Sequence, residues 1–523
     1  MNTNRDMPVG IQDFEKLRTG NYVYVDKTQY VYELGRKDRP YFLGRPRRFG
    51  KSLFISTLKV YFEGKKELFE GLAITELEKD WIQYPVIYLD FNKSASNDVE
   101  TMNAMLDFIL RNHEERWAIE QKSDSLSVRF SNLIDKAHDK FKQKVVVLID
   151  EYDKPLINTM DKPEINEQIR EILKGFYGVL KGADAHLRFV FLTGVTKFSK
   201  VSIFSDLNQL IDISMDKRFS GICGITQAEL EENFVPEITE LSETYKTSYE
   251  ETLAALKKRY NGYHFSENLE GVYNPFSLLN TFNSQTYRYY WFATGTPTFL
   301  AKALRNQNYD ICKFDNDVRI VANLVMDYRF ENQNLVPLLY QSGYLTIKSY
   351  EQDEDSYVLG FPNEEVKYGF LNELLPAFVL TPIETGKFSV IYFLRQLKSA
   401  DIEGFMTSLK AFFADIPYDD IKLEHRDEQY YQHVFYLLFT LMGQFVQTEV
   451  KSSKGRADAI VKTANSIYVF EFKMDDSATA EDALAQINSK DYAIPYFADH
   501  RNLVKVGVEF SQKEKGIKRW ITQ

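Results

Sequence analysis

The polar and apolar positions in the first 225 residues alternate between two patterns. Nearly continuous apolar runs occupy residues 40–44, 84–91, 144–150 and 188–194, with a shorter run at 208–214. Between these runs, apolar residues recur at the spacing of an amphipathic helix. Strands that are apolar on both faces are typical of a parallel sheet covered by helices on both sides. The pattern therefore predicts an α/β fold with a doubly covered parallel sheet.

After residue 225 the pattern becomes mainly helical. Thr226 and Glu229 have the spacing of a capping box, and a further helix is expected at 248–260. Two short strands at 344–350 and 356–361 flank an acidic turn and resemble the wing of a winged-helix unit. We therefore expect five parts: a sheet domain at 1–225, a helical lid at 226–310, a winged-helix-like connector at 311–375, a helical linker at 376–425, and a compact α/β domain at 426–523.

The segment GRPRRFGKS, from Gly44 to Ser52, lies between the first apolar run and an expected helix. This is the setting of a phosphate-binding P-loop, in which N–H groups near Gly50 cradle phosphate oxygens, Lys51 reaches the β- and γ-phosphates, and Ser52 ligates Mg²⁺. The loop is atypical because Arg45 stands where the general pattern has its first glycine. The alternative is a basic surface turn that contains Gly-Lys-Ser by chance.

Two acids at the end of another apolar run support the P-loop interpretation. Asp150 can hold Mg²⁺ through water, and Glu151 can polarise the attacking water. Thr193, at the end of the next run, is a candidate sensor of the γ-phosphate. The expected nucleotide-binding residues are Arg45, Arg48, Gly50, Lys51, Ser52, Asp150 and Thr193, with Glu151 as the catalytic group and with Ser52 and Asp150 as magnesium ligands.

The C-terminal part contains a second acidic group. Asp458 lies early on one expected strand, and Glu471-Phe-Lys473 ends the next. Alternate side chains share a face of a strand, so Glu471 and Lys473 point together and Phe472 points away. Carboxylates that meet on paired strands attract a divalent cation, and Glu428 on the preceding expected helix could add a third ligand. Such a site suits metal-dependent phosphodiester hydrolysis, although a surface ladder of ion pairs is the alternative.

Several segments resemble those of the AAA-ATPase-like family, whose bacterial and archaeal members often carry a C-terminal PD-(D/E)xK nuclease-superfamily domain. They are YVDKT at 24–28, RPRRFGKSL at 45–53, LIDEYDKP at 148–155 and TGVTKFSK at 193–200, with further similarity at 260–265, 273–280 and 291–297. Arg45 fits the loop of this family. The order of Glu428, Asp458, Glu471-x-Lys473 and Gln486 is similar to the nuclease superfamily, which implies a catalytic role for Gln486. The resemblance covers nearly the whole chain and implies an AAA-like P-loop NTPase domain, a restriction-endonuclease-like domain, and ATP and Mg²⁺ as cofactors.

Composition limits the partners and the compartment. The net charge of -11 does not indicate broad nucleic-acid binding, so any such contact needs a local basic patch. The chain has no run of 18 apolar residues and its start lacks the apolar stretch of a signal peptide, so we expect a cytoplasmic protein without membrane contact. Cys223 and Cys312 lack metal-ligand spacing, so we expect ordinary buried thiols and neither a disulfide nor a zinc site.

Two functions fit these patterns. The first is an ATPase whose nucleotide state controls a metal-dependent nuclease domain that acts on nucleic acid. The second is a nucleotide-switched binding or regulatory protein with a catalytically inactive nuclease-like domain. In a homo-oligomer, Arg218 could act as an arginine finger on a neighbouring subunit, although a plain surface position is the simpler expectation for this side chain.

Overall fold

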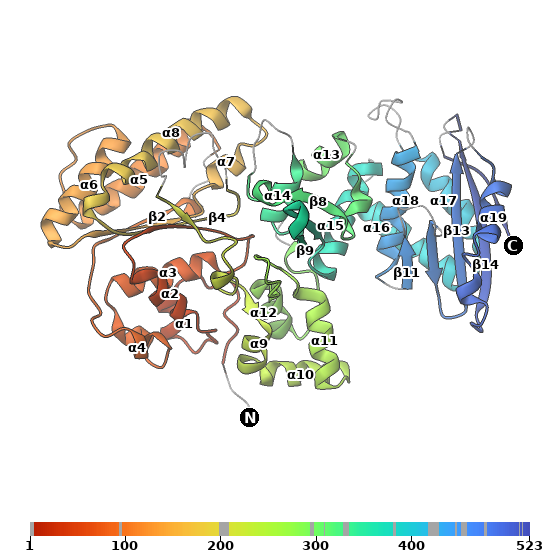
Figure 1. Cartoon of the computed structure of the whole chain (residues 1–523), viewed down its shortest axis with the longest axis horizontal. Helices are drawn as coiled ribbons and strands as arrows, with labels where there is room; N and C mark the ends of the chain where they lie inside the picture. Colours follow the sequence, from red (N-terminus) through yellow and green to blue (C-terminus); the bar gives the residue numbers. More distant parts are fainter. Residues whose placement is uncertain are drawn as a thin grey trace. The chain divides into compact units, whose positions relative to one another are not determined.

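The computed structural model divides the chain into two compact units (Figure 1). Unit 1 contains Met1–Ala293 and Asn316–Glu365, and unit 2 contains Thr294–Asp315 and Val366–Gln523. The finer division into five parts stays a prediction. The structure describes residues 5–93, 97–197, 209–292, 298–307, 309–327, 334–379, 383–416, 428–444, 447–450, 458–474, 478–511, 513–514 and 516–523.

A parallel sheet of five strands forms the centre of the N-terminal part of unit 1, as the apolar runs predict. Its strands are β1 (Pro40–Gly44), β2 (Val86–Asp90), β3 (Val145–Asp150), β4 (Leu187–Gly194) and β5 (Ile211–Asp212), in the order β2-β3-β4-β1-β5. Every neighbouring pair is parallel. Since β4 lies between β1 and β3, the carboxyl ends of these three strands meet at one edge.

Helices cover both faces of this sheet (Figure 1). One layer contains α5 (Val99–Arg116), α6 (Leu126–Phe141) and α8 (Pro163–Gly182), and the other contains α1 (Phe14–Thr19), α2 (Thr28–Gly35), α3 (Lys51–Phe62) and α4 (Ile74–Leu77), while the short α7 (Lys154–Asn158) follows β3. Phe130 of α6 stacks on Phe176 of α8 at a centroid distance of 4.6 Å within the buried core. The sequence analysis did not place α8, although its apolar stripe has helical spacing.

Small helices follow the sheet in unit 1. They are α9 (Gln227–Asn233), α10 (Val235–Tyr245), α11 (Tyr249–Tyr260) and α12 (Pro275–Ser284), together with the short strand pair β6 (Ile225–Thr226) and β7 (Val272–Tyr273). Capping boxes begin α9 at Thr226 and α11 at Ser248, which confirms both predicted helix starts. The predicted strand pair is also confirmed: β9 (Thr346–Glu351) and β10 (Ser356–Gly360) are antiparallel, with β8 (Val318–Val321) on the other side of β10 and α14 (Leu335–Gln341) before β9.

A mixed sheet with helices on both faces forms unit 2. Its strands are β11 (Gln447–Val450), β12 (Ala459–Lys462), β13 (Ser466–Met474), β14 (Asn502–Ser511) and β15 (Gly516–Thr522), which pair in chain order. Only β13 and β14 pair in parallel among these described strands. The helices are α13 (Thr298–Asn306), α15 (Glu364–Val379, whose first two residues belong to unit 1), α16 (Ile383–Lys398), α17 (Ile402–Ala414), α18 (Glu428–Met442) and α19 (Ala480–Ser489).

Aromatic side chains hold the helices of unit 2 on its sheet. Phe435 of α18 lies 3.8 Å from Phe472 of β13 between ring centroids, and Phe413 of α17 packs against Phe435 and against Phe510 of β14. The helices α16 and α17 come from the segment that was expected to be a linker. The Tyr468 hydroxyl of β13 donates a hydrogen bond to the Leu397 carbonyl near the end of α16. These two helices are therefore part of the packed unit. No helix in the described residues is both long and apolar enough to cross a membrane.

A buried acid fastens the small helices of unit 1. Oε1 of Glu365 accepts hydrogen bonds from the Ser277 hydroxyl and the Trp291 N–H, both at 2.9 Å. Within the described residues, Oε2 of Glu365 is buried without a hydrogen-bond partner. Burial raises the pKa of Glu365 to about 7, because an ionised carboxylate is poorly solvated there.

This acid makes stability depend on pH. Its folded-state pKa lies above the ordinary value of 4.5, so between these values the folded chain binds more protons, and stability falls as pH rises. We expect a lower thermal midpoint at pH 8 than at pH 6, and a smaller difference in Glu365→Gln, measured by differential scanning calorimetry. Burial also raises the pKa of Asp153 to about 7, so Asp153 should preserve part of the pH dependence of the thermal midpoint in Glu365→Gln.

The neighbouring acid provides a matched control. Glu364 forms an ion pair with the exposed Lys258 at 2.8 Å, and such a surface pair contributes little to stability. The thermal midpoint of Glu364→Gln should therefore depend on pH as it does in the unmodified protein. An unchanged slope in Glu365→Gln would contradict the assignment of this pH dependence to Glu365.

Candidate functional site

The loop between β1 and α3 turns at two residues with left-handed backbone. Arg48 has φ +68° and Gly50 has φ +95°. A Cβ at position 50 would meet no heavy atom within 4 Å, so this position favours glycine because of its backbone conformation and not because of crowding. Gly50 is exposed and is the N-cap of the 12-residue helix α3, which begins at Lys51. The N–H groups at this helix start can therefore bind an anion, as the P-loop interpretation expects.

Arg45 has a different position from the one expected. Its side chain is 1% exposed, and its guanidinium donates to the carbonyls of Gly44, Ser214 and Phe219 at 2.7 to 2.9 Å. The guanidinium carbon lies 4.1 Å from the ring centroid of Phe265. The structure therefore directs Arg45 inward as a support for the start of the loop, and not toward a phosphate. A planar group with several donors is required to reach three carbonyls and stack on a ring at once.

Two further loop residues connect the P-loop to the rest of unit 1. Phe49 is buried, with its ring 4.7 Å from that of Tyr263, and its carbonyl accepts the Gly224 N–H at 3.1 Å. The exposed Arg48 places its guanidinium 4.3 Å from the ring centroid of Phe276 on α12. The nucleotide role assigned to Arg48 stays a prediction.

The other expected nucleotide residues lie together at the carboxyl edge of the sheet. Nζ of Lys51 lies 3.0 Å from Oε1 of Glu151 and also donates to the carbonyls of Arg45 and Pro46. The hydroxyls of Ser52 and Thr193 both donate to the carboxylate of Asp150, the latter at 2.6 Å. The P-loop lysine and serine therefore face the two acids of β3.

Burial shapes the electrostatics of this edge. Asp150 is 1% exposed, and its pKa is raised to about 6 by desolvation and then by the nearby Glu151, against the lowering effect of Thr193, Ser52 and Lys51. Glu151 has φ +54°, a conformation that non-glycine residues adopt rarely and that often marks functional positions. Thr193 is fully buried beside Asp150, so the structure places it as a hydrogen-bond donor that fixes this carboxylate.

A cavity that the sequence analysis did not predict adjoins the P-loop. It has a volume of about 100 Å³ and is lined mainly by apolar side chains, including Pro8, Val25, Leu53, Cys223 and Leu279, next to Gly50. These five residues come from separate segments of unit 1. The sequence offers no signal for this convergence, because the segments lie far apart along the chain.

The second acidic group is built on β12 and β13. Phe470 and Phe472 face the aromatic core of α18, so the alternating residues Glu471 and Lys473 face the other side, as predicted. Oδ2 of Asp458 accepts the N–H of Phe472 at 2.9 Å, which holds this acid next to β13. Nζ of Lys473 lies 3.1 Å from Oε1 of Glu471, and the side-chain amide of Gln486 on α19 donates to the same oxygen.

The environment of Glu471 is that of a cation ligand. Its side chain is 2% exposed, and burial raises its pKa, against the lowering effect of Lys473, the backbone N–H of Asp458 and the side-chain amide of Gln486. Within the described residues, Oε2 of Glu471 is buried and has no hydrogen-bond partner. A buried carboxylate oxygen without a donor is costly, and a divalent cation would compensate it.

One expected residue of this site lies at the border of the described residues. Glu428 begins α18, but its side chain lies outside the described part of the chain. Arg218 lies on the surface and pairs with Asp216 at 2.5 Å, which is the simpler of its two expected positions.

Glu509 of β14 lies opposite Lys473 in the strand register. It forms ion pairs with Lys518 and Arg519, so it is not a free acid beside the site.

The two sites define the class of protein. A parallel sheet whose edge joins a P-loop lysine to an acid at the end of a neighbouring strand is that of a P-loop NTPase, and the mixed sheet of unit 2 matches a nuclease fold. Residues 8–204 match a family profile described as "Predicted AAA-ATPase", and residues 426–520 match the "PD-(D/E)XK nuclease superfamily". A protein of Azotobacter chroococcum mcd 1, "Uncharacterized protein in vnfD 5'region", is 37% identical over 531 residues, which cover 100% of this chain and 99% of that protein. The chain belongs to the AAA-ATPase-like family with a C-terminal PD-(D/E)XK nuclease-superfamily domain.

The buried Arg45 yields a test of the atypical loop. Lysine cannot reproduce three carbonyl contacts and ring stacking, so Arg45→Lys should lower the free energy of unfolding by about 2 to 4 kcal/mol. The loop should also bind nucleotide more weakly because its first turn loses its support. Thermal unfolding and binding of a fluorescent ATP analogue measure the two effects. Arg39→Lys, at an exposed position before β1, is the control and should change neither. A fully stable Arg45→Lys variant would show that these contacts do not support the loop.

Proposed function

We propose that this protein is an ATPase whose nucleotide state controls a metal-dependent nuclease domain that acts on nucleic acid. The observation that carries the proposal is the meeting of Lys51, Ser52, Asp150 and Glu151 at one edge of the sheet. The presence of an ATPase-like domain and a nuclease-superfamily domain on one chain supports an enzyme in which the first domain regulates the second. We also propose a cytoplasmic location, in keeping with a nucleotide- and nucleic-acid-dependent activity.

The residues present fit ATP with Mg²⁺. Ser52 and Asp150 face each other at the carboxyl edge of the sheet, so the hydroxyl could ligate a cation that the carboxylate holds through water. Bound Mg²⁺ would neutralise phosphate charge. The apolar cavity of about 100 Å³ beside Gly50 offers a place for the purine base. These features favour a nucleoside triphosphate over a simple phosphate ion.

Lys51 and Glu151 would exchange partners when the nucleotide binds. Lys51 now pairs with Glu151 and two loop carbonyls. A triphosphate would compete for Lys51, since phosphate oxygens carry more charge than carbonyls. Glu151 would then be free to accept a proton from the attacking water. In this proposal the ion pair holds the empty site inactive and the nucleotide activates it.

The acidic group of unit 2 would perform phosphodiester hydrolysis. Asp458 and Glu471 would hold the cation, Lys473 would neutralise charge on the phosphate, and Gln486 would orient Glu471. A bound cation would supply an activated water.

A specific observation favours a second candidate function. One oxygen of Asp458 accepts the backbone N–H of Phe472, and the chain carries a net charge of -11. Both features suit a nucleotide-switched binding or regulatory protein whose nuclease-like domain does not cleave. Divalent binding without cleavage of any nucleic acid would favour this function.

Separating binding from hydrolysis tests the ATPase half. Lys51→Ala should lose ATP binding, and Glu151→Gln should keep binding while hydrolysis falls about 100-fold or more, because the general base is removed. Binding is measured by calorimetry and hydrolysis by phosphate release. Glu164→Gln, at an exposed acid in the first turn of α8, should behave like the unmodified protein. Full hydrolysis by Glu151→Gln would exclude this residue as the base.

A cleavage assay on single- and double-stranded DNA and RNA, with Mg²⁺ or Mn²⁺ and with or without ATP, tests the nuclease half. Asp458→Ala and Glu471→Gln should abolish cleavage and keep ATP hydrolysis, since their acids lie in unit 2 and the nucleotide residues lie in unit 1. Glu514→Gln, at an exposed acid, is the matched control. If the unmodified protein cleaves none of these substrates, the second candidate function is favoured.

A further inference from the structure

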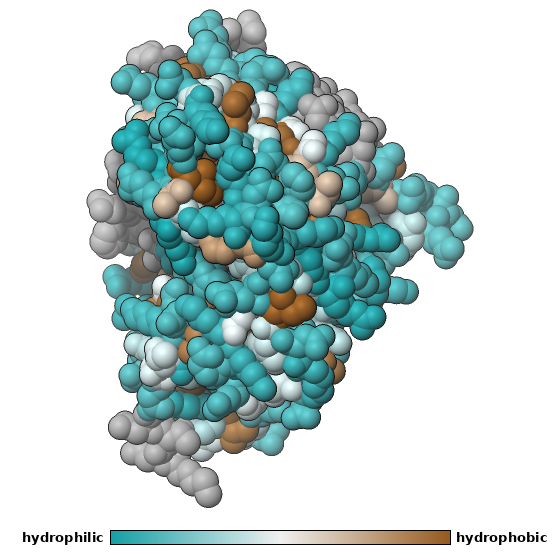
Figure 2. All heavy atoms as spheres, turned by 90° about the vertical axis from the view of Figure 1, so that its left-hand side faces the viewer, coloured by the Kyte–Doolittle hydropathy of each residue, from teal (hydrophilic) through white to brown (hydrophobic). Residues whose placement is uncertain are grey.

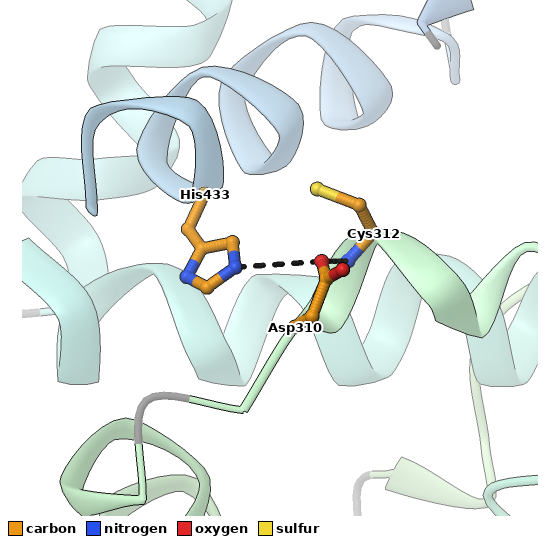
Figure 3. A group of neighbouring side chains, drawn as sticks. All are labelled: Asp310, Cys312 and His433. Atoms are coloured by element: carbon orange, nitrogen blue, oxygen red, sulfur yellow. Dashed lines mark hydrogen bonds and ion pairs between the residues drawn. The ribbon is translucent and has the colours of Figure 1, made fainter. Parts of the chain in front are cut away.

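Three side chains of unit 2 converge outside both acidic sites (Figure 3). Asp310 and Cys312 lie at the start of a short 3-10 helix, η6 (Ile311–Phe314), and His433 lies on α18. A carboxylate oxygen, the Sγ atom and an imidazole nitrogen from these residues all lie within 4.8 Å of one another. Nε2 of His433 lies 3.6 Å from Oδ1 of Asp310. The close-up shows the ring, the thiol and the carboxylate directed toward a common space.

Local structure holds each of these groups in place. Asp310 is the N-cap of η6, and its Oδ1 accepts the Cys312 N–H at 3.2 Å, which fixes the carboxylate beside the thiol. His433 is 1% exposed, and its ring meets the ring of Phe378 edge to face at 5.8 Å. Side chains held in this way lose little conformational freedom when they bind a ligand together.

The charge balance of this group favours a cation. Burial, together with the nearby Asp310, raises the pKa of the Cys312 thiol, so the thiol is protonated in the free protein. A bound divalent cation would reverse this by stabilising the thiolate. Lys313 places its Nζ 3.7 Å from Oδ2 of Asp310, and its half-exposed side chain contributes only a weak, solvent-screened attraction.

We propose that Asp310, Cys312 and His433 bind a transition-metal ion, with Zn²⁺ preferred. A thiolate, an imidazole and a carboxylate are the donor types that zinc takes, whereas Mg²⁺ and Ca²⁺ take oxygen donors. Tetrahedral zinc with bonds of about 2.0 to 2.3 Å places its ligand atoms about 3.3 to 3.8 Å apart. The group therefore needs a contraction of about 1 Å at its widest separation, which small side-chain rotations provide. Water would complete the coordination, because the Asp310 side chain is 34% exposed.

The proposed ion would act as a structural clip. It would tie η6 to α18, two segments separated by about 120 residues along the chain, and such a cross-link restricts the unfolded chain strongly. α18 also carries Phe435, which packs on β13 behind Glu471. The proposed metal ligands are different residues from those of the acidic site at Asp458 and Glu471. The proposal therefore does not depend on the proposed function. The competing account is a protonated His433 paired with Asp310, which needs no metal.

Cobalt substitution provides the test, because a thiolate bound to Co²⁺ gives a charge-transfer absorption that oxygen ligands do not. The full-length protein is freed of metal with a chelator, dialysed and titrated with Co²⁺. We expect one equivalent to produce the band, Cys312→Ser to lose it, and Cys223→Ser, which removes the second cysteine of the chain, to keep it. The absence of a band in the unmodified protein, or an equal band in Cys312→Ser, would overturn the proposal and support the metal-free ion pair.

Zn²⁺ itself should raise the thermal midpoint of the metal-free protein, and this rise should be lost in Cys312→Ser. Circular dichroism of the metal-free variants checks that they are folded. If Cys312→Ser does not fold, Asp310→Asn changes a partly exposed ligand and should weaken Zn²⁺ binding at least 10-fold. Unchanged Zn²⁺ affinity in Asp310→Asn would also overturn the proposal.

Discussion

Charge that is buried away from water must be paired, and this constraint explains how the protein is built around its sites. At the edge of the parallel sheet, Lys51 and Asp150 are almost fully buried, and each is compensated: Lys51 by Glu151 and loop carbonyls, Asp150 by the hydroxyls of Ser52 and Thr193. Leaving such a charge unpaired would cost several kcal/mol. The same pairs that stabilise the empty site are the groups that a nucleotide and its cation would rearrange, so stability and proposed function depend on one set of contacts.

In unit 2, the same need to pair buried charge acts on the polar side chains of the mixed sheet. The period of two along β13 separates its phenylalanines, which bind the helices, from Glu471 and Lys473, which form a polar face with Gln486. One oxygen of Glu471 is compensated within the chain and the other is not. The aromatic core makes the position of these polar groups rigid, and their incomplete pairing favours an added cation. Figure 2 shows the side of the molecule that lies on the left of Figure 1, and this face is mostly hydrophilic with scattered apolar residues, as is ordinary for a protein surface.

How well the sequence predicted each part follows from the range of the interactions. The strands of unit 1, the start of α3 and the capping boxes depend on local patterns, and all are confirmed. Arg45 was misread because a basic residue in a phosphate loop is locally indistinguishable from a phosphate ligand, and its three carbonyl partners come from residues that lie close only after folding. Spacing along the chain could not predict that Cys312 lies near His433, because the two residues are about 120 positions apart.

By itself, the sequence determined the family, the α/β fold class, the strands and the faces of β13, because hydrophobic periodicity and short motifs act over a few residues. Only the tertiary structure decided which way Arg45 and Thr193 point, where a cavity adjoins Gly50, and which residues surround His433. These features depend on contacts between segments that are far apart in the chain. Their energies come from burial and pairing, which exist only once the two sheets and their helices have packed.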